Sequence, residues 1–117
     1  TPSNPTGGVL AENVLKELAE IAVKNDIMVI SDEVYERLLY DDAKHISIAS
    51  LPGMKERTIT LNGFSKAYSM TGWRLGYLIG PEHVIEAAKK VHDFLTVGAA
   101  ADALVLIWLT KKVSAML

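Results

Sequence analysis

Two side chains of complementary chemistry, Asp32 and Lys66, each come shortly after a run of residues with the composition of a β-strand. Asp32 follows the apolar run 27–30, and Lys66 follows the β-branched run 57–61. Because ligands in open α/β sheets bind beyond the carboxyl ends of the strands, we expect both side chains at one edge of a sheet. A carboxylate and an amine at one edge can form a structural ion pair, or they can hold a ligand between them.

Three sequence blocks favour the ligand-binding interpretation. They read Asn-Pro-Thr-Gly at residues 4–7, Ser-Asp-Glu-Val-Tyr at residues 31–35, and Ser-Lys at residues 65–66 followed by Thr-Gly-Trp-Arg-Leu-Gly at residues 71–76. In composition and order these blocks resemble the large cofactor-binding domain of fold-type I pyridoxal-phosphate (PLP) enzymes, in particular the aspartate-aminotransferase superfamily.

The spacing of the blocks also matches that family. Asn4 and Asp32 are 28 positions apart, Asp32 and Lys66 are 34 apart, and Lys66 and Arg74 are eight apart. The resemblance extends over residues 1–101. It implies that this part of the chain is a partial PLP-binding large domain.

The resemblance implies the two main chemical roles. Lys66 would bind PLP covalently through its ε-amine, and the freed amine would then move a proton between the substrate α-carbon and the aldehyde carbon of the cofactor. Asp32 would keep the pyridine nitrogen protonated, since opposite charges about 4 Å apart attract by roughly 4 kcal/mol at an effective dielectric near 20. A protonated ring accepts electrons from the substrate more readily. The structural alternatives are a surface lysine and a helix-capping aspartate.

Four further residues match cofactor-binding positions of the family. Tyr35 and Asn4 match residues that hydrogen-bond the phenolic oxygen of PLP from two sides. Arg74 would bind the phosphate, which a guanidinium fork fits in bidentate fashion, and the hydroxyl of Ser65 could add a donor there. The alternatives are a packing aromatic, a turn residue and an edge-strand arginine. Gly63 departs from the family pattern, because many relatives have a serine at that position.

The elements expected to position these residues alternate between helix and strand. Apolar residues at helical spacing predict helices at 10–25 and 82–95, and β-branched or apolar runs predict strands at 27–30, 57–61 and 73–79. Residues 35–51 are predicted to be an irregular connection. The run 27–30 is wholly apolar, as is typical of a strand buried on both faces. We therefore expect an α/β class, a partial three-layer fold with a mostly parallel sheet.

The last part of the chain differs from the rest. Residues 102–117 form an apolar tail of uncertain relationship to the family, and residues 99–117 have a helical composition. The resemblance implies that a phosphate-binding loop, an aromatic residue stacked on the pyridine ring and a carboxylate-binding small domain are needed in addition to these residues. We therefore expect that the 117 residues do not catalyse transamination alone.

Composition narrows the function classes. The 117 residues carry a net charge of −2, which gives no general attraction to nucleic acid or to anionic membrane. There is no cysteine, so disulfides and thiolate metal sites are excluded, and a cytoplasmic location is expected. The sequence begins without a signal-peptide pattern, and the nearly apolar stretch 97–109 is shorter than the roughly 20 residues that span a bilayer. His45, His83 and His92 lack metal-ligand spacing, so no metal site is expected.

The leading functional hypothesis is a segment of a PLP-dependent aminotransferase. Such an enzyme transfers an amino group between an amino acid and a 2-oxo acid, and the resemblance implies that it works as a homodimer. Two alternatives stay open: a PLP-dependent carbon–sulfur lyase-type relative, and a non-enzymatic aminotransferase-like ligand-sensing domain of a regulator. One branch of such lyases has histidine where Tyr35 stands, which disfavours the first alternative. The sequence does not identify the amino acid substrate.

Overall fold

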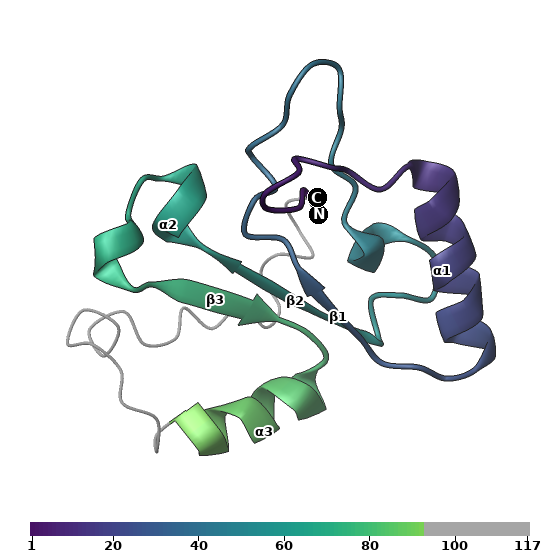
Figure 1. Cartoon of the computed structure of the whole chain (residues 1–117). Helices are drawn as coiled ribbons and strands as arrows, with labels where there is room; N and C mark the ends of the chain where they lie inside the picture. Colours follow the sequence, from purple (N-terminus) through teal and green to yellow (C-terminus); the bar gives the residue numbers. More distant parts are fainter. Residues whose placement is uncertain (93–117) are drawn as a thin grey trace, which may run out of the picture.

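The computed structural model describes residues 1–92, which form a small α/β unit (Figure 1). Its elements are α1 (Glu12–Lys24), β1 (Val29–Asp32), the 3-10 helix η1 (Ile48–Ser50), β2 (Thr58–Gly63), α2 (Phe64–Ala67), the 3-10 helix η2 (Thr71–Trp73), β3 (Gly76–Ile79) and α3 (Glu82–His92). The α/β class is confirmed. The predicted tail at 102–117, its helical composition and the last residues of the second predicted helix lie outside the described residues.

The three strands form one sheet in the order β1-β2-β3. β1 and β2 are parallel, with Asp32 opposite Leu61, whereas β2 and β3 are antiparallel, with Gly63 opposite Gly76. A mostly parallel sheet was expected, and the described residues contain one parallel and one antiparallel pair of strands. This topology brings the carboxyl ends of β1 and β2 and the start of β3 to the same edge.

The first strand begins two residues later than the sequence predicted. The backbone N–H of Ile27 bonds to the carbonyl of Ala22 in α1 at 2.9 Å, so the end of the helix engages this residue. The ladder with β2 starts only at Val29, whose N–H bonds to the carbonyl of Arg57 at 2.8 Å. As a consequence, Asp32 is the last residue of β1 and does not follow the strand.

The expectation that this strand is buried on both faces is corrected by the described residues. Val29 packs against the core, whereas Ile30, on the other face, is 67% exposed. Successive residues of a strand point to opposite faces, so only the face of Val29 is covered within residues 1–92. Ser31 and Glu33 lie on that covered face, because they follow Val29 at intervals of two.

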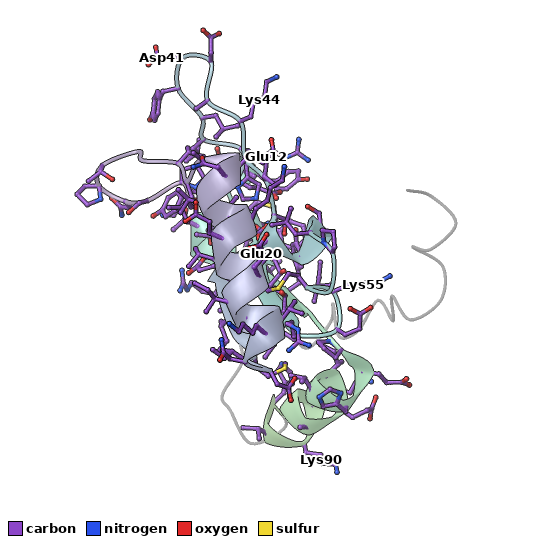
Figure 2. All side chains as sticks on the ribbon, turned by 90° about the vertical axis from the view of Figure 1, so that its right-hand side faces the viewer. Glu12, Glu20, Asp41, Lys44, Lys55 and Lys90 are labelled. Carbon is purple, nitrogen blue, oxygen red and sulfur yellow. The ribbon has the colours of Figure 1, made fainter. Side chains whose placement is uncertain are left out.

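The core lies between α1 and the segment around η1. One face of α1 carries Leu15, Ala19 and Ala22, which recur at helical spacing and pack with Ile48 and Met54. Figure 1 shows α1 on the β1 side of the sheet, and Figure 2 shows Glu12 and Glu20 on its outer surface. None of the helices in residues 1–92 is long and apolar enough to cross a membrane.

The third strand is shorter than predicted, because it starts at Gly76 and not at residue 73. Residues Thr71–Trp73 form η2, and Arg74 then adopts a left-handed conformation with φ 54°. A left-handed residue cannot continue a strand, so pairing with β2 resumes only after Leu75. The connection between β2 and β3 therefore spans residues 64–75, and it contains three of the predicted cofactor-binding residues.

Candidate cofactor-binding site

Asp32 lies at the sheet edge where β1 ends. Its Oδ1 accepts a hydrogen bond from the N–H of Val34 at 3.1 Å, and its carbonyl oxygen lies 3.4 Å from the terminal nitrogen of Thr1. The residue is exposed. Within residues 1–92 its second carboxylate oxygen has no hydrogen-bond partner, so this oxygen is available as an acceptor for a ligand.

Asn4, Tyr35 and Lys66 are brought into contact from three distant parts of the sequence. The side-chain amide of Asn4 donates to the hydroxyl oxygen of Tyr35 at 3.2 Å. The ammonium nitrogen of Lys66 lies 5.7 Å from the centre of the Tyr35 ring, which is within the range of a cation–π contact. Because Tyr35 accepts the bond from Asn4, its own hydroxyl proton remains free to be donated elsewhere.

Lys66 is half-buried on α2, the short helix that directly follows β2. Since β1 and β2 are parallel, α2 begins at the same sheet edge as the turn that carries Tyr35. No carboxylate in the described part of the chain pairs with the Lys66 amine. The sequence-based expectation that Asp32 and Lys66 share one edge agrees with this topology, and the alternative of a direct ion pair between them is absent within residues 1–92.

Ser65 and Arg74 are joined through Thr71. The Thr71 hydroxyl donates to the carbonyl of Ser65 at 2.9 Å, and the Arg74 guanidinium donates to the carbonyl of Thr71 at 3.3 Å. Both residues belong to the 64–75 connection, which leaves and re-enters the sheet at the same edge. Across residues 1–92, no hydrogen bond or ion pair connects Arg74 to Asp32 or Tyr35. Ser65 and Arg74 are thus held near each other by the connection and not by contact with the other predicted site residues.

Gly63 stands where the sequence departs from the pattern that the resemblance implies, and the structure supplies a steric reason for glycine. A Cβ at this position would lie 3.0 Å from the carbonyl oxygen of Leu75 and 3.3 Å from the Cα of Gly76. Both atoms belong to the backbone of the neighbouring strand segment and cannot move aside easily. A serine here would therefore push β2 and β3 apart directly before α2.

A buried polar cluster centred on Glu33 was not predicted from the sequence. This residue is only 3% exposed, and its carboxylate is hydrogen-bonded to Ser31, Ser47 and His45. Potential ligand atoms of Glu33, Glu36 and His45 lie within 4.8 Å of one another. Hydrogen bonds engage both Glu33 oxygens, whereas none joins the Glu36 side chain to Glu33 or His45 within residues 1–92. Strand alternation places Ser31 and Glu33 on the face of Val29, so it could have indicated that Glu33 is buried, but not which residues it contacts.

Three aromatic rings pack beside the candidate site. Phe64 contacts Tyr68 and Tyr77, with ring centroids 5.5 and 5.7 Å apart. Partial burial raises the pKa of Tyr77 above its ordinary value, and the nearby negative charge of Glu36 adds to this effect. The phenol of Tyr77 therefore remains neutral over a wider pH range than a free tyrosine.

A concave region lies at the end of the sheet opposite to α2. It is a hollow of about 490 Å³ whose lining includes Thr58, Pro81 and His83. Thr58 begins β2, and Pro81 follows β3, so this hollow is separated from Lys66 by the length of β2. It does not include any of the predicted cofactor-binding residues.

The chain resembles known aminotransferases along most of its length. The family model "Aminotransferase class I and II" matches residues 1–114. Aspartate aminotransferase from Pinus pinaster is 54% identical over 102 residues, which are 86% of this chain and 21% of the pine protein. Aromatic-amino-acid aminotransferase 2 from Thermococcus litoralis is 62% identical over 86 residues, which are 74% of this chain and 22% of that protein.

A comparison with solved structures agrees with the similarity in sequence. The structure of N-succinyldiaminopimelate aminotransferase from Mycobacterium tuberculosis superimposes with a TM-score of 0.81 at 44% identity, and the match covers 86% of this chain and 26% of that one. The chain thus spans about a fifth to a quarter of the length of these relatives. With a family match over nearly all of its residues and a shared fold, the chain belongs to the class I and II aminotransferase family.

Proposed function

We propose that this chain provides the cofactor-binding lysine and the residues around it in a PLP-dependent aminotransferase. The observation that carries the proposal is the contact of Lys66 and Asn4 with the same side chain, Tyr35, at the edge where Asp32 ends β1. These residues offer an amine, a carboxylate and a phenol with a free proton. The three groups fit, in that order, the aldehyde, the pyridine nitrogen and the phenolic oxygen of PLP.

When bound, PLP supplies an acceptor for the negative charge that develops at the α-carbon of an amino acid. The residues of this chain would bind the cofactor and control the positions of the protons. Lys66 would hold the cofactor through its ε-amine and would be the group that moves a proton to or from the substrate α-carbon. Asp32 would keep the pyridine nitrogen protonated, because an adjacent carboxylate favours the cationic ring.

Tyr35 and Asn4 act on the phenolic oxygen of the cofactor. Tyr35 would donate its proton there, because the hydrogen bond that its oxygen accepts from Asn4 leaves this proton free. Charge-assisted hydrogen bonds of this kind stabilise an oxyanion more strongly than neutral ones. The two residues thereby favour the ionised phenolic oxygen.

Arg74 and Ser65 serve the phosphate group. Arg74 has no ion-pair partner within residues 1–92, and its guanidinium stays charged when it is desolvated. Thr71 ties both residues into one connection, so the Arg74 guanidinium is linked through Thr71 to α2, which carries Ser65. The substrates we propose are an amino acid and a 2-oxo acid, and the proposed assembly is a homodimer.

The test is a direct mapping of the reactive lysine. The protein is incubated with PLP and reduced with borohydride, and the labelled residue is identified by mass spectrometry. We expect the label on Lys66 and its loss in Lys66→Ala, whereas the exposed Lys55→Ala should retain it. A label on another lysine in the parent protein would contradict the proposal.

A further inference from the structure

Glu33 is the most deeply buried charged residue in the described part of the chain, with 3% exposure, and it immediately follows Asp32. Burying a carboxylate is unfavourable unless it is paired and hydrogen-bonded. Oε1 accepts bonds from Ser47 Oγ at 2.7 Å and from Ser31 Oγ at 3.0 Å, and Oε2 lies 3.0 Å from His45 Nε2. Both oxygens therefore have hydrogen-bond partners, and these partners hold the side chain from two sides.

The hydrogen bond between Glu33 and His45 has a direction. An ionised carboxylate only accepts hydrogen bonds, so beside an ionised Glu33 the Nε2 of His45 is the donor. The other ring nitrogen, Nδ1, is buried and has no partner within residues 1–92. An amide at position 33 would either oppose its own N–H to the Nε2–H of His45 or require the proton to move to Nδ1, where the N–H would be buried without an acceptor within residues 1–92.

The network ties the end of β1 to a segment that is distant in sequence. His45 and Ser47 belong to the stretch that returns to the core before η1, after the outer loop labelled at Asp41 and Lys44 in Figure 2. The backbone of Glu33 is held too: its N–H bonds to the carbonyl of Leu61 at 2.8 Å, and its carbonyl accepts the N–H of Glu36 at 2.9 Å.

These bonds bracket the residues that face the cofactor in the proposed function. Asp32 precedes Glu33 directly, and Tyr35 lies within the turn that the bond from Glu36 to Glu33 closes. If the Glu33 side chain rotated, the turn could shift relative to β2 and α2, which carries Lys66. A displacement of the reacting groups by about 1 Å can reduce a rate about a hundredfold, even when the mutation that causes it lies far from them.

We propose that Glu33 is a positioning residue, whose buried contacts with Ser31, His45 and Ser47 hold the Asp32 carboxylate and the Tyr35 hydroxyl in place against the cofactor. This inference rests on the proposed function, since it concerns the same site. Glu33 itself points to the other face of β1 and does not touch the cofactor in this proposal.

The experiment compares Glu33→Gln with the parent full-length protein and with a matched control, Glu20→Gln, on the exposed surface of α1 (Figure 2). Three quantities are measured: the pH midpoint at which the absorption of bound PLP changes, kcat and KM. For Glu33→Gln we expect a midpoint shift of about one pH unit and a fall in kcat of about tenfold, with KM within about twofold. Glu20→Gln should behave as the parent does.

A second variant guards against a Glu33→Gln protein that does not fold. Ser47→Ala removes the shortest bond to Glu33 and leaves the buried charge, so we expect a midpoint shift in the same direction and of smaller size. The proposal is overturned if each of these two variants that folds has the pH midpoint and the kcat of the parent. A lower melting temperature in such a variant would not rescue it. Borohydride labelling of the parent separates the two ideas: without a label on Lys66 the proposed function fails, whereas a labelled parent with unaltered variants refutes only the role of Glu33.

Discussion

The side-chain amide of Asn4 donates a hydrogen bond of 3.2 Å to the hydroxyl of Tyr35, although 31 positions separate the two residues. The same tyrosine ring lies 5.7 Å from the Lys66 ammonium. A residue of the N-terminal loop thereby sets the direction in which the Tyr35 proton can be donated, and it does so next to the amine that we expect to bind PLP.

Tyr35→Phe tests this arrangement. Loss of the hydroxyl removes a donor to the ionised phenolic oxygen, and a hydrogen bond to a charged group contributes about 1.5–3 kcal/mol. We therefore expect PLP affinity, measured by equilibrium titration, to fall by about tenfold to a hundredfold. Asn4→Ala should cause a smaller loss in the same direction, because Tyr35 keeps its proton. Unchanged affinity in Tyr35→Phe would assign the tyrosine a packing role only.

Asp32→Asn separates catalysis from cofactor retention. The amide keeps the size of the side chain but loses the negative charge, which is worth about 4 kcal/mol at about 4 Å and an effective dielectric near 20. In the complete enzyme we expect kcat to fall by about a hundredfold or more, with a much smaller change in PLP affinity, measured by steady-state kinetics and titration. Asp41→Asn, on the exposed outer loop, is the control and should retain parental kcat. Equal turnover of Asp32→Asn and parent would rule out the proposed electrostatic role.

Gly63→Ala and Gly72→Ala form a matched pair within one part of the fold. The added methyl at position 63 would meet backbone atoms of Leu75 and Gly76 at 3.0 and 3.3 Å, whereas at position 72 nothing lies within 4 Å. We expect Gly63→Ala to lower the free energy of unfolding by about 1–3 kcal/mol, as overpacking typically does, and to weaken PLP binding by displacing α2. Gly72→Ala should change neither quantity appreciably. Chemical denaturation and PLP titration of both variants provide the measurement, and equal behaviour of the pair would contradict the steric argument.

Most helices and strands of the described fold were predicted from local sequence patterns, whereas α2 was not predicted, and the deviations at β1 and β3 have local causes. Helix periodicity predicted α1 to within two residues at its start, and the positions of β2 and α3 were found. β1 and β3 were each shifted because a helix end engaged the N–H of Ile27 and because Arg74 took a left-handed conformation. Single-residue backbone choices of this kind leave no periodic signal.

The candidate site was predictable in part for a different reason. Strand order and parallel pairing follow from the α/β pattern, so the shared edge of Asp32 and Lys66 could be inferred. The Glu33 network could not be read in the same way, because His45 and Ser47 come from an irregular connection without periodicity. Only the burial of Glu33 itself followed from strand alternation, and its partners required the three-dimensional path of residues 36–47.

Met54→Ala tests the core that supports the site. Met54 is fully buried among Leu15, Ala19, Ala22 and Ile48, so its truncation leaves a cavity. We expect a loss of about 2–5 kcal/mol in the free energy of unfolding. The neighbouring Lys55→Ala is exposed and should change it by no more than about 0.5 kcal/mol. Urea unfolding monitored by circular dichroism measures both, and comparable losses in the two variants would contradict the assigned core.

Tyr77 gives the protein a predictable response to alkaline pH. Partial burial is the largest cause of its raised pKa, and the charge of Glu36 is the second. The unfolded chain releases this proton near the ordinary value of 10.0, whereas the folded chain still holds it there. The folded state therefore binds more protons above pH 10, so this group's contribution to stability is complete below pH 10 and is lost as the pH rises through the folded pKa.

An ultraviolet titration of phenolate absorbance in the parent, minus that of Tyr77→Phe, should show a midpoint above 10, and Glu36→Gln should lower this midpoint. A difference curve centred at or below 10 would show that the Tyr77 phenol is not shielded by the packing against Phe64.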